Sequence, residues 1–219
     1  MPHNLRIDFV SDVSCPWCAI GLSALEQALQ RLEGQVQADL HFQPFELNPH
    51  MGPEGQDVGE HLTQKYGSTP SQQADIRERI RQRGAEEGFV FNPNGRGRIW
   101  NTFDAHRLLH WAGTLEPPEG AQHALKKGLL VAYHGQARSM SDHAVLLDVV
   151  GQVGLDVDQA RDVLDGGRYA DEVRAQESHF QSLGIRSVPA VVINNRHLVS
   201  GGQPAEVFEQ ALRQIANGT

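Results

Sequence analysis

The first 42 residues combine a strand pattern, a helix pattern and a second strand pattern in quick succession. Apolar and polar side chains alternate over residues 5–9 and again over residues 38–42, which indicates two half-buried strands. Between them an apolar stripe recurs at helical spacing and ends before Gly34, with members Cys18, Leu22, Leu25, Leu29 and Leu32. A unit of this length predicts two parallel strands joined by a right-handed helical crossover.

The middle of the chain, residues 57–183, carries helical patterns instead. Thr69 followed by Pro70 and Gln72 is typical of a helix start, with a capping side chain and a proline in the first turn. The helix that follows, to about Gly88, is highly charged, so we expect it to be exposed. Further helices are expected over residues 101–112, 120–134, 141–153, 156–164 and 169–183.

Strand patterns return near the C-terminus. Residues 190–193 form an apolar, β-branched run that indicates a strand buried on both faces. Asn194-Asn195 supplies a turn, residues 197–199 return as a hairpin strand, and Pro204 begins a last helix. The sequence therefore predicts an α/β fold of βαβ…ββα type from residues 1–48 and 185–219, interrupted by a large all-helical insertion over residues 49–184.

Charge and composition exclude several classes of protein. The 219 residues carry 19 basic and 27 acidic side chains, a net charge of −8, which argues against nucleic-acid binding. The short basic tract Arg96-Gly97-Arg98 is expected to be a solvated loop. No apolar run reaches the length of a membrane-spanning helix, and residues 1–12 lack the features of a signal peptide. We therefore expect a cytoplasmic protein without a membrane partner.

The two cysteines, Cys15 and Cys18, lie between the first strand and the first helix in the run Cys15-Pro16-Trp17-Cys18. The unpaired amides and the dipole at a helix N-terminus stabilise an anion, so the pKa of Cys15 is expected to fall from about 8.5 towards about 7. Cys18 lies one turn deeper and begins the apolar stripe. This asymmetry predicts that Cys15 reacts first and that Cys18 resolves the mixed disulfide, a reaction that needs no tightly bound cofactor.

A second motif, Val188-Pro189, stands directly before the strand at residues 190–193 and predicts a cis peptide bond. A strand leading into Cys-Pro-Trp-Cys, a helical insertion and a Val-Pro before a ββα unit resembles the DsbA family of thioredoxin-fold oxidoreductases. Residues 12–21, 44–49 and 101–108 are similar to its FrnE-like branch. The resemblance covers nearly the whole chain.

The resemblance implies a thioredoxin-like fold with Cys15 as the nucleophile and Cys18 as the resolving cysteine. It further implies that Pro16 and Trp17 tune the redox potential, that Pro189 is cis and faces the disulfide, and that the backbone of Val188 pairs with an extended substrate. His106 is a candidate substrate contact because it lies in a family-like segment. Some FrnE-like proteins carry a second cysteine pair near the C-terminus, and this chain has none.

We therefore predict a thiol-disulfide oxidoreductase or isomerase acting on peptide or small-molecule disulfides. Glutathione is a candidate co-substrate, and a homodimer is compatible with the sequence. Two alternatives stay open: a glutathione-dependent transferase or isomerase of a small aromatic or polyketide-like substrate, and a non-catalytic thiol chaperone. A zinc site built from the cysteines with His106 and His110 is disfavoured, because residues 19–105 intervene where compact zinc modules use a spacing of about 12–15 residues. No bound metal is expected.

Overall fold

The computed structural model describes residues 2–115 and 120–218. A four-stranded sheet has the order β2-β1-β5-β6. Strand β1 (His3–Ser11) pairs in parallel with β2 (Val36–Pro44) and antiparallel with β5 (Ala190–Ile193), which pairs antiparallel with β6 (His197–Ser200). The two ends of the chain therefore build one sheet, as the sequence predicts for a thioredoxin-like fold.

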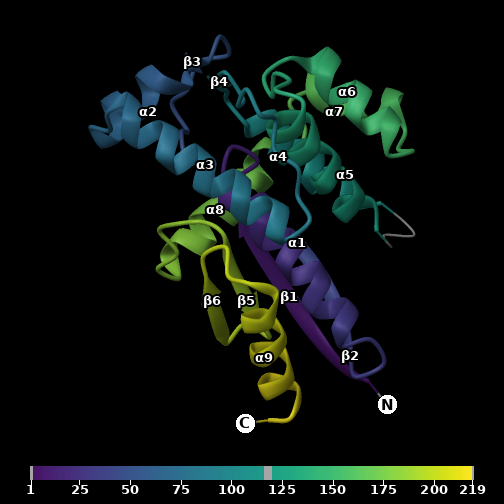
Figure 1. Cartoon of the computed structure of the whole chain (residues 1–219). Helices are drawn as coiled ribbons and strands as arrows, with labels where there is room; N and C mark the ends of the chain where they lie inside the picture. The colour runs from purple at the N-terminus through teal and green to yellow at the C-terminus, as the bar shows by residue number, and fades with distance from the viewer. Residues whose placement is uncertain (1, 116–119, 219) are drawn as a thin grey trace.

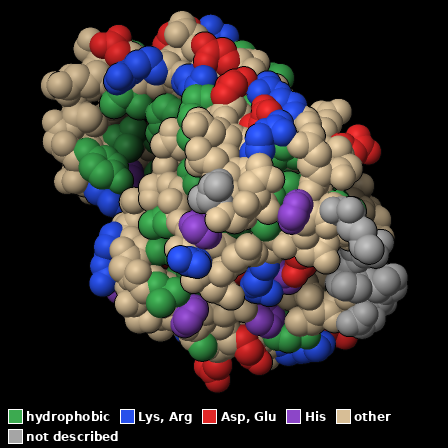
Figure 2. Space-filling view, turned by 90° about the horizontal axis from the view of Figure 1, so that it is seen from below, with side chains coloured by type: hydrophobic (Ala, Val, Ile, Leu, Met, Phe, Trp, Pro, Cys, Tyr) green, Lys and Arg blue, Asp and Glu red, His purple; other side chains and the backbone are tan. Residues whose placement is uncertain are grey.

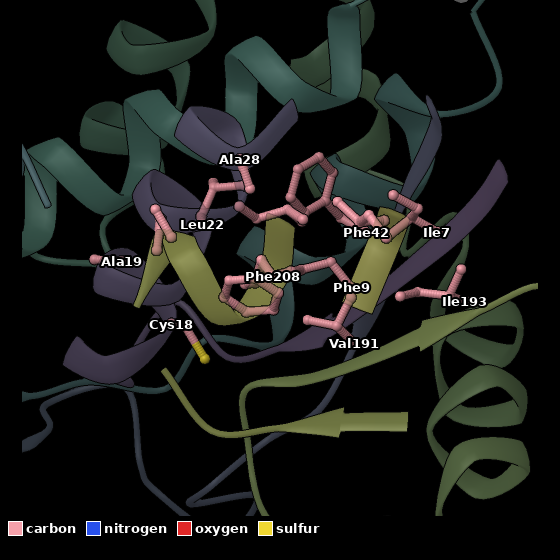
Figure 3. Close-up of a cluster of buried hydrophobic side chains, with 14 of the residues drawn as sticks. Ile7, Phe9, Cys18, Ala19, Leu22, Ala28, Phe42, Val191, Ile193 and Phe208 are labelled. Carbon is pink, nitrogen blue, oxygen red and sulfur yellow. The ribbon is translucent and has the colours of Figure 1, made fainter. Parts of the chain in front are cut away.

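Two helices pack together beside this sheet. Helix α1 (Pro16–Arg31) connects β1 to β2, and α9 (Ala205–Ala216) lies against α1, below the insertion helices in the view of Figure 1. The register places Phe9 of β1 beside Phe42 of β2 and beside Val191 of β5. These side chains meet Phe208 of α9 in a buried cluster, with Cys18 at its edge (Figure 3). The resolving cysteine of the prediction is therefore anchored in the core of the sheet region.

The insertion is built mainly from helices, with a second apolar core of its own that includes Leu108, Leu125 and Val150. Its helices are α2 (Val58–Tyr66), α3 (Pro70–Glu86), α4 (Phe103–Ala112), α5 (Ala121–Leu130), α6 (His143–Gln152), α7 (Val157–Asp165) and α8 (Ala170–Ser182). A π-helical turn, η1 (Val131–Gly135), continues α5. The other face of the sheet meets α8, where Val10 packs with Phe180.

Several local predictions are confirmed. The side chain of Thr69 accepts from the backbone N–H of Gln72 while the Gln72 side chain accepts from the N–H of Thr69, a reciprocal cap for α3. Helix α3 is largely exposed: Gln73 and Gly84 are buried, and Ile80 and Arg83 are half-buried. The insertion also holds a small antiparallel pair, β3 (Gln56–Asp57) and β4 (Arg98–Ile99), which the sequence did not reveal because two residues are too few to show alternation.

The division into residues 1–48 with 185–219 and residues 49–184 stays a prediction, and its outermost residues, 1 and 219, lie outside the described residues. Within the described parts of the chain, no helix combines the length and the apolar character that crossing a bilayer requires.

Candidate active site

Cys15 is the N-cap of α1, at the point where strand β1 gives way to the helix. Its backbone is extended (φ −89°, ψ 116°), and Pro16 follows as the first helical residue. The N–H of Cys15 donates to the carbonyl of Asp12 and the N–H of Cys18 donates to the carbonyl of Cys15, both at 3.1 Å. The strand, the tight turn and the helix thus hold Cys15 at the positive end of the helix dipole.

The two thiols are free and differ in burial. Cys15 is 4% exposed and Cys18 is fully buried, whereas Trp17 between them is 37% exposed. Trp17 is therefore the surface feature of the motif, as the sequence predicts. Cys18 is the more deeply buried of the two cysteines, as expected, although Cys15 is also largely buried.

The thiol of Cys15 points towards the other end of the chain. Its Sγ donates to the carbonyl oxygen of Val188 at 3.5 Å. The Val188–Pro189 bond is cis, as predicted, and the carbonyl of Pro189 accepts from the N–H of Gly201 at 2.8 Å. A Cβ placed on Gly21 would lie 3.1 Å from Cγ of Pro189, so α1 and this proline are in close contact. The structure therefore brings together the two motifs that the sequence singled out.

The turn at Gly201-Gly202 packs against Trp17, next to the contact between Cys15 and Val188. A Cβ added to Gly202 would lie 2.9 Å from the backbone oxygen of Trp17 and 3.4 Å from its ring. Real Cβ atoms do not approach a backbone oxygen that closely, so Gly202 lets the turn pack directly against the Cys-Pro-Trp-Cys segment.

The two cysteines have opposite acidities. A hydrogen bond from the Cys18 thiol lowers the pKa of Cys15; burial and the charge of Asp12 oppose this, and the backbone N–H groups of Cys18 and Trp17 reinforce it. Burial raises the pKa of Cys18 well above that of an ordinary thiol, and its hydrogen bond to Cys15 raises it further. Cys15 is therefore the group that ionises first, and Cys18 is the proton donor that stabilises its thiolate.

Asp12 is a buried carboxylate behind the dithiol that sequence reasoning missed. Its Oδ1 accepts from the N–H of Ser14 at 2.9 Å and from the hydroxyl of Thr102 at 2.8 Å, and its Oδ2 accepts from the N–H of Leu47 at 2.7 Å. Burial on its own would raise the pKa of Asp12, but the His106 ring and these N–H groups lower it. The carboxylate therefore stays charged and ties the turn before Cys15 to the segments after β2 and before α4.

His106 lies behind the dithiol and not on a surface that a substrate can reach. The side chain is 2% exposed, and its Nε2 is 3.6 Å from Oδ1 of Asp12. The expectation of a substrate contact came from the segment around His106, whereas helix α4 turns the ring inwards. His106 is better described as a neighbour of the buried carboxylate.

Side chains of the insertion hold the two residues before Cys15. The Arg96 guanidinium donates to the carbonyl of Ser14 and stacks on the ring of Tyr133, 5.4 Å from its centroid. Nε2 of His134 donates to the carbonyl of Val13 at 2.8 Å, and burial lowers the pKa of His134 to about 3. The expectation of a solvated Arg96 is wrong, because its head group binds at the active-site turn.

A cavity of about 310 Å³ lies beside Pro16, between α2, α3 and the segment at residues 91–97. Its wall is partly apolar and its charged members are Arg77, Arg81, Arg96, Asp57 and Glu78. The surface is hollowed on the left of Figure 2, the side on which α2 and α3 lie in Figure 1, and hydrophobic side chains line the hollow below charged ones. The reactive motif therefore opens onto a space that can hold part of a substrate.

The described residues contain no group of three or more His, Cys, Asp or Glu side chains placed to hold a metal ion. Nδ1 of His110, the partner of His106 in the zinc alternative, donates to Oε1 of Gln176 at 3.1 Å.

Comparison with known proteins gives a consistent picture. A family model described as a DSBA-like thioredoxin domain matches residues 6–213. A solved structure described as a probable DsbA oxidoreductase from Streptomyces coelicolor is 34% identical, with 98% of this chain and 90% of that chain covered and a TM-score of 0.86. The protein YwbO of Bacillus subtilis is 25% identical over 210 residues, 95% of this chain and 96% of that protein. The cytosolic disulfide reductase DsbM from Pseudomonas aeruginosa, solved with GSH, shares the fold at 18% identity, with 97% and 99% of the two chains covered and a TM-score of 0.67.

Proposed function

Because the chain belongs to the DSBA-like thioredoxin domain family, we propose that it is a thiol-disulfide oxidoreductase in which Cys15 attacks a substrate disulfide and Cys18 completes the exchange. The observation that carries the proposal is the placement of the two thiols: Cys15 caps α1 and faces the carbonyl of Val188, while Cys18 lies fully buried one turn deeper. The hydrogen bond between them and the burial of Cys18 give the two thiols opposite acidities. A low-pKa thiol next to a protonated partner is the arrangement that dithiol exchange uses. Assignment to the FrnE-like branch stays a prediction from the sequence.

The proposed reaction has two steps. The Cys15 thiolate attacks one sulfur of the substrate disulfide, the substrate S–S bond breaks, and the first substrate thiolate leaves. Cys18 then loses its proton and attacks Sγ of Cys15, so the second substrate thiolate leaves and a Cys15–Cys18 disulfide forms. Two electrons pass from the protein to the substrate, and the same steps in reverse oxidise a dithiol.

The substrate is proposed to lie across Val188 and the cavity beside Pro16. The carbonyl of Val188 already accepts from the reactive thiol, so an extended backbone at this edge would meet the sulfur directly. The cavity carries three arginines against one aspartate and one glutamate, in a chain whose net charge is −8. This local positive balance favours an acidic or carboxylate-bearing flank next to the substrate sulfur.

The location and the recycling partner are also proposals. DsbM is described as cytosolic and was solved with GSH, and the shared fold supports a cytoplasmic site and glutathione as the co-substrate of this chain. A homodimer stays a prediction.

The proposal is tested by single-cysteine variants acting on disulfide-bonded peptides. Cys15→Ser should abolish turnover, and Cys18→Ser should accumulate a mixed disulfide at Cys15 that mass spectrometry detects. Full activity in Cys15→Ser contradicts the proposal. Tight glutathione binding with weak disulfide exchange would instead support a glutathione-dependent isomerase, and suppression of aggregation that survives loss of both thiols would support a chaperone.

The substrate flank is tested in the same assay by comparing peptides with acidic and basic residues beside the cysteine. Arg77 of α3 lines the cavity, whereas Arg79, two residues on, does not. Arg77→Glu should reduce kcat/KM for the acidic peptide more than for the basic one, and the matched variant Arg79→Glu should leave the ratio unchanged. An equal effect of both variants would contradict the cavity as the binding site.

A further inference from the structure

Lys126 is a fully buried amine behind the dithiol. It comes from α5, its side chain is 0% exposed, and its Nζ has no hydrogen-bond partner within the described residues. Burying an unpaired ammonium is unfavourable by several kcal/mol, and an apolar side chain of similar volume would avoid that cost. The position therefore holds a titratable amine that packing alone does not require.

The Lys126 amine shares a small cavity with a second polar group that lacks a hydrogen bond. The cavity has a volume of about 10 Å³ and lies between α4, α5, β2 and α8; Lys126, His106, His110 and Gln176 are among its lining residues. Nε2 of His106 has no hydrogen-bond partner either. A volume of this size takes roughly one water molecule, which here would accept from a Lys126 ammonium. The site can thus support the ammonium form of Lys126.

The groups around this amine are mainly anions or acids. Burial lowers the pKa of Lys126, while the charges of Cys18, Asp12 and Cys15 raise it. The remaining titratable groups nearby are the histidines, His106 and His110 across the small cavity and His134, whose pKa Lys126 helps to lower. In return, Lys126 lowers the pKa of Cys18 against the larger effects of burial and of Cys15.

The charges that act on Cys18 change when Cys15 forms a mixed disulfide with a substrate. The negative charge of Cys15 is then gone, because its sulfur is part of a disulfide. Two groups then favour a thiolate at Cys18: the charge of Lys126 and a hydrogen bond from the backbone N–H of Asp12. Of the two, Lys126 is the one that brings a positive charge. Cys18 must become a thiolate in this buried setting before it can attack.

We propose that the Lys126 ammonium is the counter-charge that allows Cys18 to form a thiolate in the mixed disulfide, and that it thereby sets the rate of the resolving step. The inference rests on the proposed function. In this step Cys18 releases its proton to solvent, its thiolate bonds to Sγ of Cys15, the bond between Cys15 and the substrate breaks, and the substrate leaves as a thiolate. Lys126 is a positioning residue, because it acts through Cys18 and neither forms nor breaks a bond itself.

The experiment follows both steps in one reaction with the full-length reduced protein and Ellman's reagent. Attack by Cys15 releases the first coloured thiolate, and attack by Cys18 on the mixed disulfide releases the second. Lys126→Met removes the charge at similar volume. Lys127→Met is the matched control, because Lys127 is the next residue of the same helix but lies at the surface, paired with Glu26 at 3.0 Å.

We expect Lys126→Met to leave the first phase within about twofold of wild type and to slow the second by at least about tenfold near neutral pH, the effect of one pKa unit on the thiolate fraction. The pH midpoint of the second phase should move upwards. Lys126→Arg, which keeps the charge, should recover part of the rate, and Lys127→Met should behave as wild type. If Lys126→Met melts far below wild type, Lys126→Gln carries the same test.

A second phase with unchanged rate and pH midpoint in Lys126→Met would overturn the inference, as would equal slowing by Lys127→Met. Equal slowing of both phases would also overturn it, because it would indicate a general loss of structure. A wild-type protein that shows no second phase, or a Cys18→Ser variant that still shows one, would count against the proposed function itself. The two failures are therefore distinguishable.

Discussion

The thiol of Cys15 lies 3.5 Å from the carbonyl oxygen of Val188, although the two residues are 173 positions apart. The contact exists because β1 leads into Cys15 while β5, its antiparallel neighbour, begins just after the cis Val188–Pro189 bond. The ends of the two central strands thus present the reactive sulfur and a backbone acceptor side by side. An incoming chain at this edge would compete with Cys15 for that carbonyl.

Replacing Cys18 by alanine should raise the pKa of Cys15. The hydrogen bond from the Cys18 thiol is the largest cause of the lowered pKa, and its loss removes the donor that favours the thiolate. A hydrogen bond to a charged group contributes about 1.5–3 kcal/mol, so we expect the rise to lower the thiolate fraction of Cys15 near neutral pH by at least about tenfold. The rate of iodoacetamide alkylation against pH measures it. Cys18→Ser, which keeps a donor, should show a smaller rise, and equal behaviour of both variants would contradict this assignment.

Replacing Gly202 by alanine should disturb the active-site motif without touching a cysteine. The added Cβ would lie 2.9 Å from the backbone oxygen of Trp17, so one of the two backbones must move. We expect the free energy of unfolding to fall by about 1–3 kcal/mol, together with slower alkylation of Cys15. Gly135→Ala is the control, since its Cβ comes no closer than 3.4 Å to a neighbouring atom. Equal effects of the two variants would mean that contact with Trp17 is unimportant.

Stability should fall in acid partly through His134. Its pKa is lowered from 6.5 to about 3 by burial, so between these values the unfolded chain binds a proton that the folded protein does not. Folding stability from this group is therefore complete above about pH 6.5 and decreases as pH falls towards 3, by about 1.4 kcal/mol per pH unit.

Denaturant unfolding at several pH values checks this contribution. His134→Gln keeps a donor for the carbonyl of Val13 but does not titrate, so its stability should depend less steeply on pH in that window. His50→Gln, at an exposed position, should retain the wild-type slope. A wild-type slope in His134→Gln would show that other groups account for the acid sensitivity.

Much of the fold could be predicted from local patterns. Alternation identified β1 and β2, and an apolar, β-branched run identified β5. The apolar stripe of α1 placed Cys18 inside, and Thr69 with Gln72 marked the start of α3. The position of Cys15 between a strand and a helix was enough to predict its lowered pKa. These features depend on neighbours a few residues away, which a sequence displays directly.

The polar groups behind the dithiol could not be predicted in the same way, because their burial depends on contacts between distant segments. Lys126 and Lys127 are adjacent and chemically identical, yet the first is buried and the second is half exposed. One signal was present: Lys126 precedes Leu129 and Leu130 by three and four residues, which places it on the apolar face of α5. Lysine side chains are mostly exposed in proteins, so this position alone did not predict that Lys126 is buried.

The strand order β2-β1-β5-β6 has a consequence for biosynthesis. While the ribosome is still translating the insertion, β1 has its parallel neighbour β2 but lacks β5 on its other side. The nascent Cys15 then has no Val188 carbonyl to bind, because the segment that supplies it follows the whole insertion in the chain. Assembly of the reactive centre therefore waits until the whole insertion has been made and the β5–β6 hairpin docks on β1.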